Sequence, residues 1–194
     1  TIADADVVVS GGTLSNFTGS GSAYAATFTA SLNFTGSASI KVASGKFTDS
    51  AGNTNEDGEE ANNNLTIAID TQAPVITTFS PENSATKVGV ASDIVLTFSE
   101  KIQKGTGNVV LKTSAGLTIA TYEVASSNNL TLTDTTLTIN PTFNLSFDTS
   151  YKIEIASGAF KDLFGNDLAA TSTYNFTTVC SIIGTAAGEI LNGT

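Results

Sequence analysis

The residues of this chain best suited to chemistry are its carboxylates and carboxamides, and their most regular arrangement occurs twice. The stretch "ASGKFTDSAGN" (43–53) returns as "ASGAFKDLFGN" (156–166), so the pattern Phe-x-Asp-x-x-Gly-Asn repeats at about the length of one domain. Asp followed by Gly and Asn is typical of a turn in which the carboxylate accepts backbone N–H groups and Gly supplies a positive φ. The motif therefore predicts the connection between the last two strands of each of two units, with Phe47 and Phe160 packed in their cores.

The later copy of the motif has a second interpretation, a cation site. In an antiparallel sandwich, the connection between the last two strands lies at the same end as the start of the first strand and the end of the second. Calcium binds six to eight oxygens from carboxylates, amides and carbonyls, and it would neutralise acids that otherwise repel each other. The ligands predicted for this interdomain calcium site are Asp70, Glu100, Asp162, Asn166 and Asp167.

The earlier copy opens an acidic loop, "DSAGNTNEDGEEANNN" (49–64), which offers a second candidate calcium site. Its predicted ligands are Asp49, Asn53, Asn55 and Asp57. The spacing does not match an EF-hand, which needs a bidentate Glu at the end of its loop. A solvated acidic turn explains the same residues, and both readings stay open.

Composition excludes several classes of function. The chain has 18 acidic residues against 8 lysines, no arginine and a net charge of −10, so nucleic acid is a poor partner. A single cysteine and no histidine argue against zinc, copper and haem, and leave no base to activate a nucleophile. No apolar run approaches the roughly 18 residues of a membrane span. We therefore expect that the protein is not an enzyme and does not insert into a membrane. Its expected cofactor is calcium.

Alternating β-branched and aromatic residues predict an all-β fold of tandem immunoglobulin-like sandwiches. The first domain is expected to span residues 1–70 and the second residues 71–178, followed by a tail at 179–194. Five strands are expected in the first domain, near 5–12, 14–19, 24–32, 39–47 and 64–70. Seven are expected in the second, within 74–81, 93–100, 108–114, 117–125, 130–141, 150–157 and 172–179. Most aromatic residues, including Phe143 and Phe147, are expected in the cores.

Aligning "DVVV" with "NVVL" leaves the first domain without a counterpart of the first two strands of the second. Three explanations are open: the sequence begins inside the domain, another chain donates a strand, or the C-terminal tail supplies one. An incomplete sandwich exposes strand edges that invite pairing. The expected partners are accordingly neighbouring immunoglobulin-like domains of the same chain and other copies of the chain by strand exchange.

The phrases "GGTLSNFTGSG" and "FTGSASIKVA" within 6–53 resemble the bacterial Ig-like repeats of giant secreted adhesins. "APVITTFSPENSATKVGVASDIVLTFSEKI" (73–102) resembles the related S-layer-type bacterial Ig-like domain, and "IDTQAP" resembles the acidic calcium-holding linkers between cadherin-type domains. The tail "GTAAGEILNGT" (184–194) is similar to the start of an RTX repeat, with Glu189 where Asp is usual. The resemblance implies a type-1-secreted protein displayed on the bacterial cell surface, with a stalk or adhesive role and calcium-dependent rigidity.

These observations predict non-catalytic extender modules of an extracellular adhesin, stiffened by interdomain calcium. Two alternatives stay open. The chain could be a self-assembling S-layer or fibre subunit that completes its first domain by strand complementation. It could also be a glycan- or peptide-binding module, although it has no tryptophan for a sugar-stacking surface.

Overall fold

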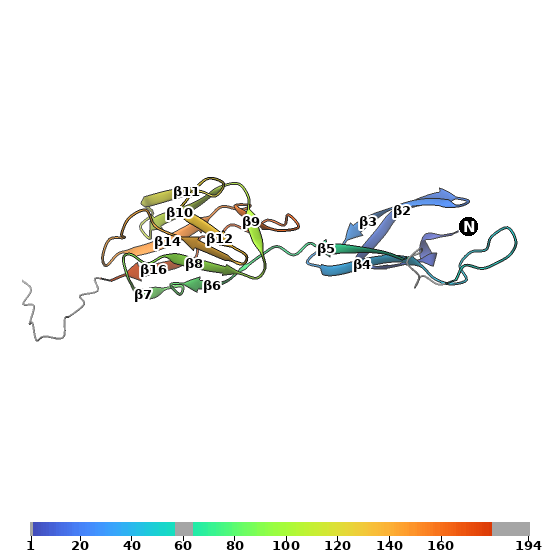
Figure 1. The fold of residues 1–194 in the computed structure, drawn as a ribbon, viewed down its shortest axis with the longest axis horizontal. Helices are drawn as coiled ribbons and strands as arrows, with labels where there is room; N and C mark the ends of the chain where they lie inside the picture. The colour runs from blue at the N-terminus through green and yellow to red at the C-terminus, as the bar shows by residue number, and fades with distance from the viewer. Residues whose placement is uncertain (1, 57–63, 180–194) are drawn as a thin grey trace, which may run out of the picture. The chain divides into compact units, whose positions relative to one another are not determined.

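The computed structural model describes residues 2–56 and 64–179, which divide into two compact units. Unit 1 spans Thr1–Ala73, and unit 2 begins at Pro74. The described residues form β-strands and one short 3-10 helix, η1 (Asp4–Asp6), and contain no α-helix. The predicted all-β class is confirmed (Figure 1).

Unit 2 is a sandwich of two sheets whose neighbouring strands are mostly antiparallel (Figure 1). The larger sheet has the order β11 (Thr118–Glu123), β10 (Asn108–Thr113), β14 (Ser150–Ile155), β16 (Asn175–Thr178) and β7 (Ala85–Val88). The smaller has the order β12 (Leu130–Thr133), β13 (Thr136–Ile139), β8 (Ile94–Phe98) and β6 (Ile76–Ser80). A two-stranded ribbon pairs β9 (Ile102–Lys104) with β15 (Phe160–Asp162).

The core of unit 2 lies between the two larger sheets because alternate residues of their strands point inward. In β8 every second side chain is buried, and Leu96 faces the core together with Ile153 of β14. Tyr174 stacks on Phe79 with ring centroids 4.4 Å apart, and its hydroxyl donates to the Pro81 carbonyl at 2.8 Å. Burial raises the pKa of Tyr174 well above its ordinary value, so this phenol stays a donor.

The seven segments predicted as strands of unit 2 all contain strands, with one correction. The segment 130–141 is not one strand but the β12–β13 hairpin, which turns at Asp134 with φ 48°. Strands β7, β9 and β15 were not predicted, because each has only three or four residues and depends on a partner far away in the sequence. Thus β7 pairs in parallel with β16, and β9 pairs with β15.

Unit 1 contains five strands in two sheets (Figure 1). The three-stranded sheet has the order β1 (Val7–Ser10), β4 (Thr35–Val42) and β5 (Asn64–Asp70), the same order as β10, β14 and β16 of unit 2. The second sheet pairs β2 (Gly12–Ser20) with β3 (Ala23–Ala30). Since the described part of unit 1 has no strands equivalent to β6 and β8, the expectation of a sandwich without its first two strands is confirmed.

This difference leaves unit 1 with an open core. Among the hydrophobic residues in its described part, only Ala38 is buried. A groove of about 330 Å³, which we call the unit 1 groove, is lined mainly by apolar side chains from β1 to β5, among them Val7, Leu14, Phe28, Ile40, Val42 and Leu65. The apolar surface that a complete sandwich would cover is therefore accessible in unit 1.

The prediction that Phe47 fills the core of unit 1 is wrong. Phe160 is completely buried, whereas Phe47 is 36% exposed. The physical reason is the missing neighbour: Phe160 packs against Phe98 of β8, with ring centroids 6.1 Å apart, and no equivalent strand occurs in the described part of unit 1. The core assignment also fails for Phe143 and Phe147, which are exposed in the loop between β13 and β14.

Candidate metal centre

The repeated motif forms the turn between β15 and β16, and Asp162 organises it. Its Oδ1 accepts the backbone N–H groups of Phe164 and Asn166, both at 2.8 Å, and its Oδ2 accepts Nδ2 of Asn166 at 2.6 Å. The Asp162 N–H donates to the Asn166 carbonyl at 3.1 Å, and Gly165 has φ 97°. The carboxylate thus caps the turn, as the sequence predicts.

The earlier copy of the motif builds the same turn between β4 and β5. Asp49 Oδ1 accepts the N–H groups of Ala51 at 2.8 Å and Asn53 at 2.9 Å, and its Oδ2 accepts Nδ2 of Asn53 at 2.9 Å. Gly52 has φ 91°. The Asn53 side-chain amide and the backbone N–H groups of the turn lower the pKa of Asp49 below its ordinary value, because they stabilise the charged form.

Within unit 2, the later turn meets a second acid. Glu100 follows β8, and one of its carboxylate oxygens lies within 4.8 Å of a carboxylate oxygen of Asp162. Calcium–oxygen distances are about 2.3–2.6 Å, so two ligands of one ion can lie up to about 5 Å apart. The separation of Glu100 and Asp162 therefore fits a shared calcium ion.

The carboxylate of Asp162 could offer one lone pair to a calcium ion. Its side chain is completely buried, and hydrogen bonds within the turn occupy three of the roughly four lone-pair positions of its carboxylate. A buried carboxylate beside another acid is costly unless its charge is balanced. A divalent cation would balance both charges, and the turn hydrogen bonds would hold Asp162 in place for it.

The other residues predicted for this site each make contacts within their own unit. Asn166 donates its side-chain amide to Asp162. Asp167 lies 3.7 Å from Nζ of Lys161, with which it also forms a β-bridge. We therefore do not include Asp167 in the ligand set proposed below. Asp70 closes β5 in unit 1, where its Oδ1 accepts Oγ1–H of Thr35 and the N–H of Gln72, both at 2.9 Å.

The second candidate site in unit 1 forms a hydrogen-bonded turn in its described part. Asn55 Oδ1 accepts the N–H groups of Lys46 at 2.7 Å and Phe47 at 3.0 Å, so this amide braces the loop. Within residues 2–56 and 64–179, no group of three acidic side chains includes Asp49. Asp57, the fourth predicted ligand, lies outside the described residues.

No motif in the sequence points to Gln103, which supports the turn from β9. Its side-chain Nε2 donates to the Asp162 carbonyl at 2.7 Å. The contact depends on the pairing of β9 with β15, whose strands are separated by more than fifty residues in the chain. A single Gln between Ile102 and Lys104 cannot indicate such a long-range contact.

Two family models, each described as a bacterial Ig-like domain, match residues 70–178 and 1–69. The chain belongs to the bacterial Ig-like domains. These domains typically occur in surface or extracellular proteins and are generally non-catalytic. The first match includes Asp70 together with Glu100 and Asp162, so all three acids belong to one bacterial Ig-like domain by sequence.

A comparison with curated proteins found no significant match. Among the described residues, no helix has the length and apolar character needed to cross a membrane.

Proposed function

We propose that the two bacterial Ig-like domains are extender modules of an extracellular bacterial adhesin, and that calcium stiffens the joint between them. The observation that carries the calcium proposal is the buried carboxylate of Asp162 within 4.8 Å of Glu100. The tandem family matches support the structural role, since two such domains follow each other without an intervening segment.

The proposed ligands are Asp162, Glu100 and the side-chain carbonyl of Asn166 from unit 2, and Asp70 at the end of β5 in unit 1. Asp70 lies only four residues before Pro74, the first residue of unit 2, and within the family match of that domain. Joints between domains are mobile unless something fixes them. A cation held by residues from both sides would convert the linker into a rigid connection and keep a terminal binding domain away from the cell.

The test is a calcium titration of the full chain, followed by calorimetry and small-angle scattering. An ion at one hundred times its dissociation constant stabilises the folded state by about 2.7 kcal/mol, so calcium should raise the melting temperature of unit 2. It should also narrow the distribution of particle dimensions. Magnesium, which prefers smaller octahedral sites, should do less.

Three variants locate the effect. Glu100→Gln should abolish the thermal shift, whereas Asp70→Asn should reduce it and remove the change in scattering. Asp148→Asn, an exposed acid with no role in the proposal, is the matched control. If wild-type melting and scattering ignore calcium, the metal proposal fails, and the acids are only turn residues.

A second candidate function has specific support in unit 1. Strand β3 of unit 1 corresponds to β13 of unit 2, because β3 is followed by β4 and β13 by the equivalent strand β14. In unit 2, β13 pairs with both β12 and β8. In the described part of unit 1, β3 pairs only with β2. An unpaired edge beside the apolar unit 1 groove suits the addition of a strand from another copy of the chain. Under this proposal the protein self-assembles into a fibre or S-layer.

Light scattering during size-exclusion chromatography distinguishes the two candidates. A strand acceptor should form dimers or larger species as concentration rises, and Ala26→Pro in β3 should keep it monomeric by removing an edge N–H. A wild-type chain that remains monomeric at all concentrations would exclude self-assembly and leave the extender role.

A further inference from the structure

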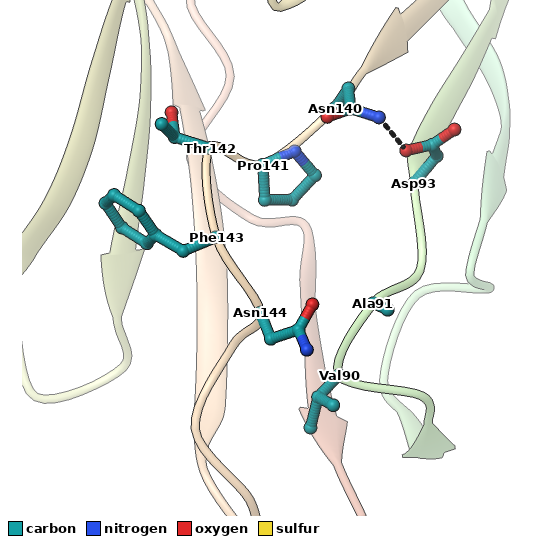
Figure 2. A pocket seen from close by; sticks show the side chains of 8 residues that line it. All are labelled: Val90, Ala91, Asp93, Asn140, Pro141, Thr142, Phe143 and Asn144. Carbon is teal, nitrogen blue, oxygen red and sulfur yellow. Dashed lines mark hydrogen bonds between the residues drawn. The ribbon is translucent and has the colours of Figure 1, made fainter.

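A hollow of about 240 Å³, here called the end pocket, lies where β8 begins and β13 ends (Figure 2). It is therefore at the opposite end of unit 2 from Glu100, which follows the other end of β8. Two chain segments form it, the loop between β7 and β8 and the segment that follows β13. Its polar side chains are those of Asp93, Asn140, Thr142 and Asn144.

Hydrogen bonds hold the end pocket in shape. Asn140 Nδ2 donates to Asp93 Oδ1 at 2.8 Å, which fixes the carboxylate (Figure 2). The backbone of Asn140 is itself anchored, since its carbonyl accepts Nδ2 of Asn129 at 2.8 Å and its N–H donates to the Asn129 carbonyl at 2.9 Å. The two segments are joined by the Leu145 N–H, which donates to the Val90 carbonyl at 2.8 Å. The side chains of Asp93 and Asn140 are thus pre-organised for a ligand.

The lining selects a neutral ligand with many hydroxyl groups. It combines a carboxylate that only accepts, two amides that donate and accept, and a hydroxyl that does both. Sugar hydroxyls need such mixed partners, and the apolar face of a sugar ring can lie against Val90 and Pro141. No lysine lines the pocket, so Asp93 would repel a phosphate or sulfate, and one carboxylate is too little charge for a tight calcium site.

The size of the end pocket limits the ligand. A volume of about 240 Å³ is below the usual range of roughly 300–1,000 Å³ for drug-sized molecules, and suits one sugar ring. Phe143, which is 60% exposed, lies at the edge of the pocket with its ring directed away from Asp93 (Figure 2). This aromatic ring could stack on a second sugar ring that continues out of the pocket.

We propose that the end pocket binds a neutral saccharide, one pyranose ring at a time, through Asp93, Asn140, Thr142 and Asn144. This binding site is independent of the calcium joint, because it lies within unit 2 and shares no residue with the proposed ligands of the ion. It would give a structural module a weak affinity for surface glycans.

The experiment is an NMR titration of the full chain with glucose, galactose, mannose, fucose and N-acetylglucosamine, each added separately to 50 mM. Glycerol and calcium are added in parallel as non-saccharide probes. At least one sugar should shift the amide signals of residues 89–93 and 140–145, with a dissociation constant of about 1–10 mM, as expected for so few ligand atoms.

Variants with matched controls assign the effect to the pocket. Asp93→Ala and Thr142→Val should each weaken binding of that sugar about tenfold, whereas Asp148→Ala should leave it unchanged. Phe143→Ala should weaken a disaccharide of the same sugar more than the monosaccharide, and Phe147→Ala should affect neither. Thr142→Val keeps the side-chain shape, so its result stands even if Asp93→Ala perturbs the loop.

Three outcomes would overturn the proposal. The first is no shift at 89–93 and 140–145 with any sugar, and the second is sugar-induced shifts confined to other residues. The third is an equal response to glycerol or to calcium, which would identify the hollow as an unspecific solvent site or a cation site.

Discussion

The turn around Asp49 in unit 1 and the turn around Asp162 in unit 2 have the same hydrogen bonds and different surroundings. In both, Asp accepts the same two backbone N–H groups and the same Asn amide. Yet Asp162 and Phe160 are fully buried, whereas Asp49 and Phe47 are exposed. Local sequence therefore determines the turn, and the neighbouring strands determine how deeply its aspartate and phenylalanine are buried.

The largest difference between the turns is expected for the aromatic residue. Phe160→Ala should lower the free energy of unfolding of unit 2 by about 4 kcal/mol, because it removes a buried ring and leaves a cavity beside Phe98. Phe47→Ala should cost unit 1 about 1 kcal/mol, because this ring is already partly in water. Urea unfolding followed by NMR measures both units in one sample. Equal losses would show that unit 1 has a closed core in solution.

The capping aspartates should differ next. In calcium-free buffer, Asp162→Ala should destabilise unit 2 by about 3 kcal/mol, since it empties the space of a completely buried carboxylate and removes the acceptor of the Phe164 and Asn166 N–H groups. Asp49→Ala should have a smaller effect, because water can replace the lost acceptor. Thermal unfolding by calorimetry checks the pair, with Asp148→Asn as a surface control, because Asn tolerates the positive φ of this position. A loss in unit 1 as large as in unit 2 would contradict the role given to burial.

Substitution of the glycine should cost the two turns the same free energy of unfolding. Gly52 and Gly165 have φ near 90°, and a Cβ added to either would meet no atom within 4 Å. Alanine at each position should therefore cost about 1 kcal/mol through backbone strain alone. Differential scanning calorimetry of Gly52→Ala and Gly165→Ala tests this. A clearly larger cost at Gly165 would mean that packing as well as strain acts on that turn.

The smallest expected effect is a pH dependence of unit 1. Because the folded state lowers the pKa of Asp49 from an ordinary value of 3.8, its contribution to stability is present above that value and is lost as the pH falls through the lower, folded value. Acid unfolding of unit 1 should therefore become shallower below about pH 4 in Asp49→Asn. Unchanged slopes in wild type and variant would show that the hydrogen bonds to Asp49 do not favour its charged form.

Alternation of β-branched and aromatic residues was enough to predict the long strands, and the Asp-x-x-Gly-Asn motif was enough to predict both turns. The three shortest strands of unit 2 could not be found, because their stability comes from partners distant in the chain. The exposure of Phe47 could not be deduced from its own motif either, since it depends on the absence of a strand equivalent to β8. The contact between Lys161 and Asp167 could not be predicted either, because it depends on a β-bridge that the loop forms within itself.

The parallel pairing of β7 with β16 has a mechanical consequence. In the sequence, β7 lies near the start of unit 2 and β16 near its end. Backbone hydrogen bonds beside the two strands also connect them: the Ser84 N–H donates to the Asn175 carbonyl at 2.7 Å, and the Val179 N–H donates to the Val88 carbonyl at 2.9 Å. If tension pulls the two ends of the unit apart, these parallel strands slide along each other, and their hydrogen bonds are loaded together in shear. Antiparallel strands pulled from one end would instead open one bond at a time. The pairing of β7 with the last strand should therefore make unit 2 resistant to stretching, a property that its thermal stability does not measure.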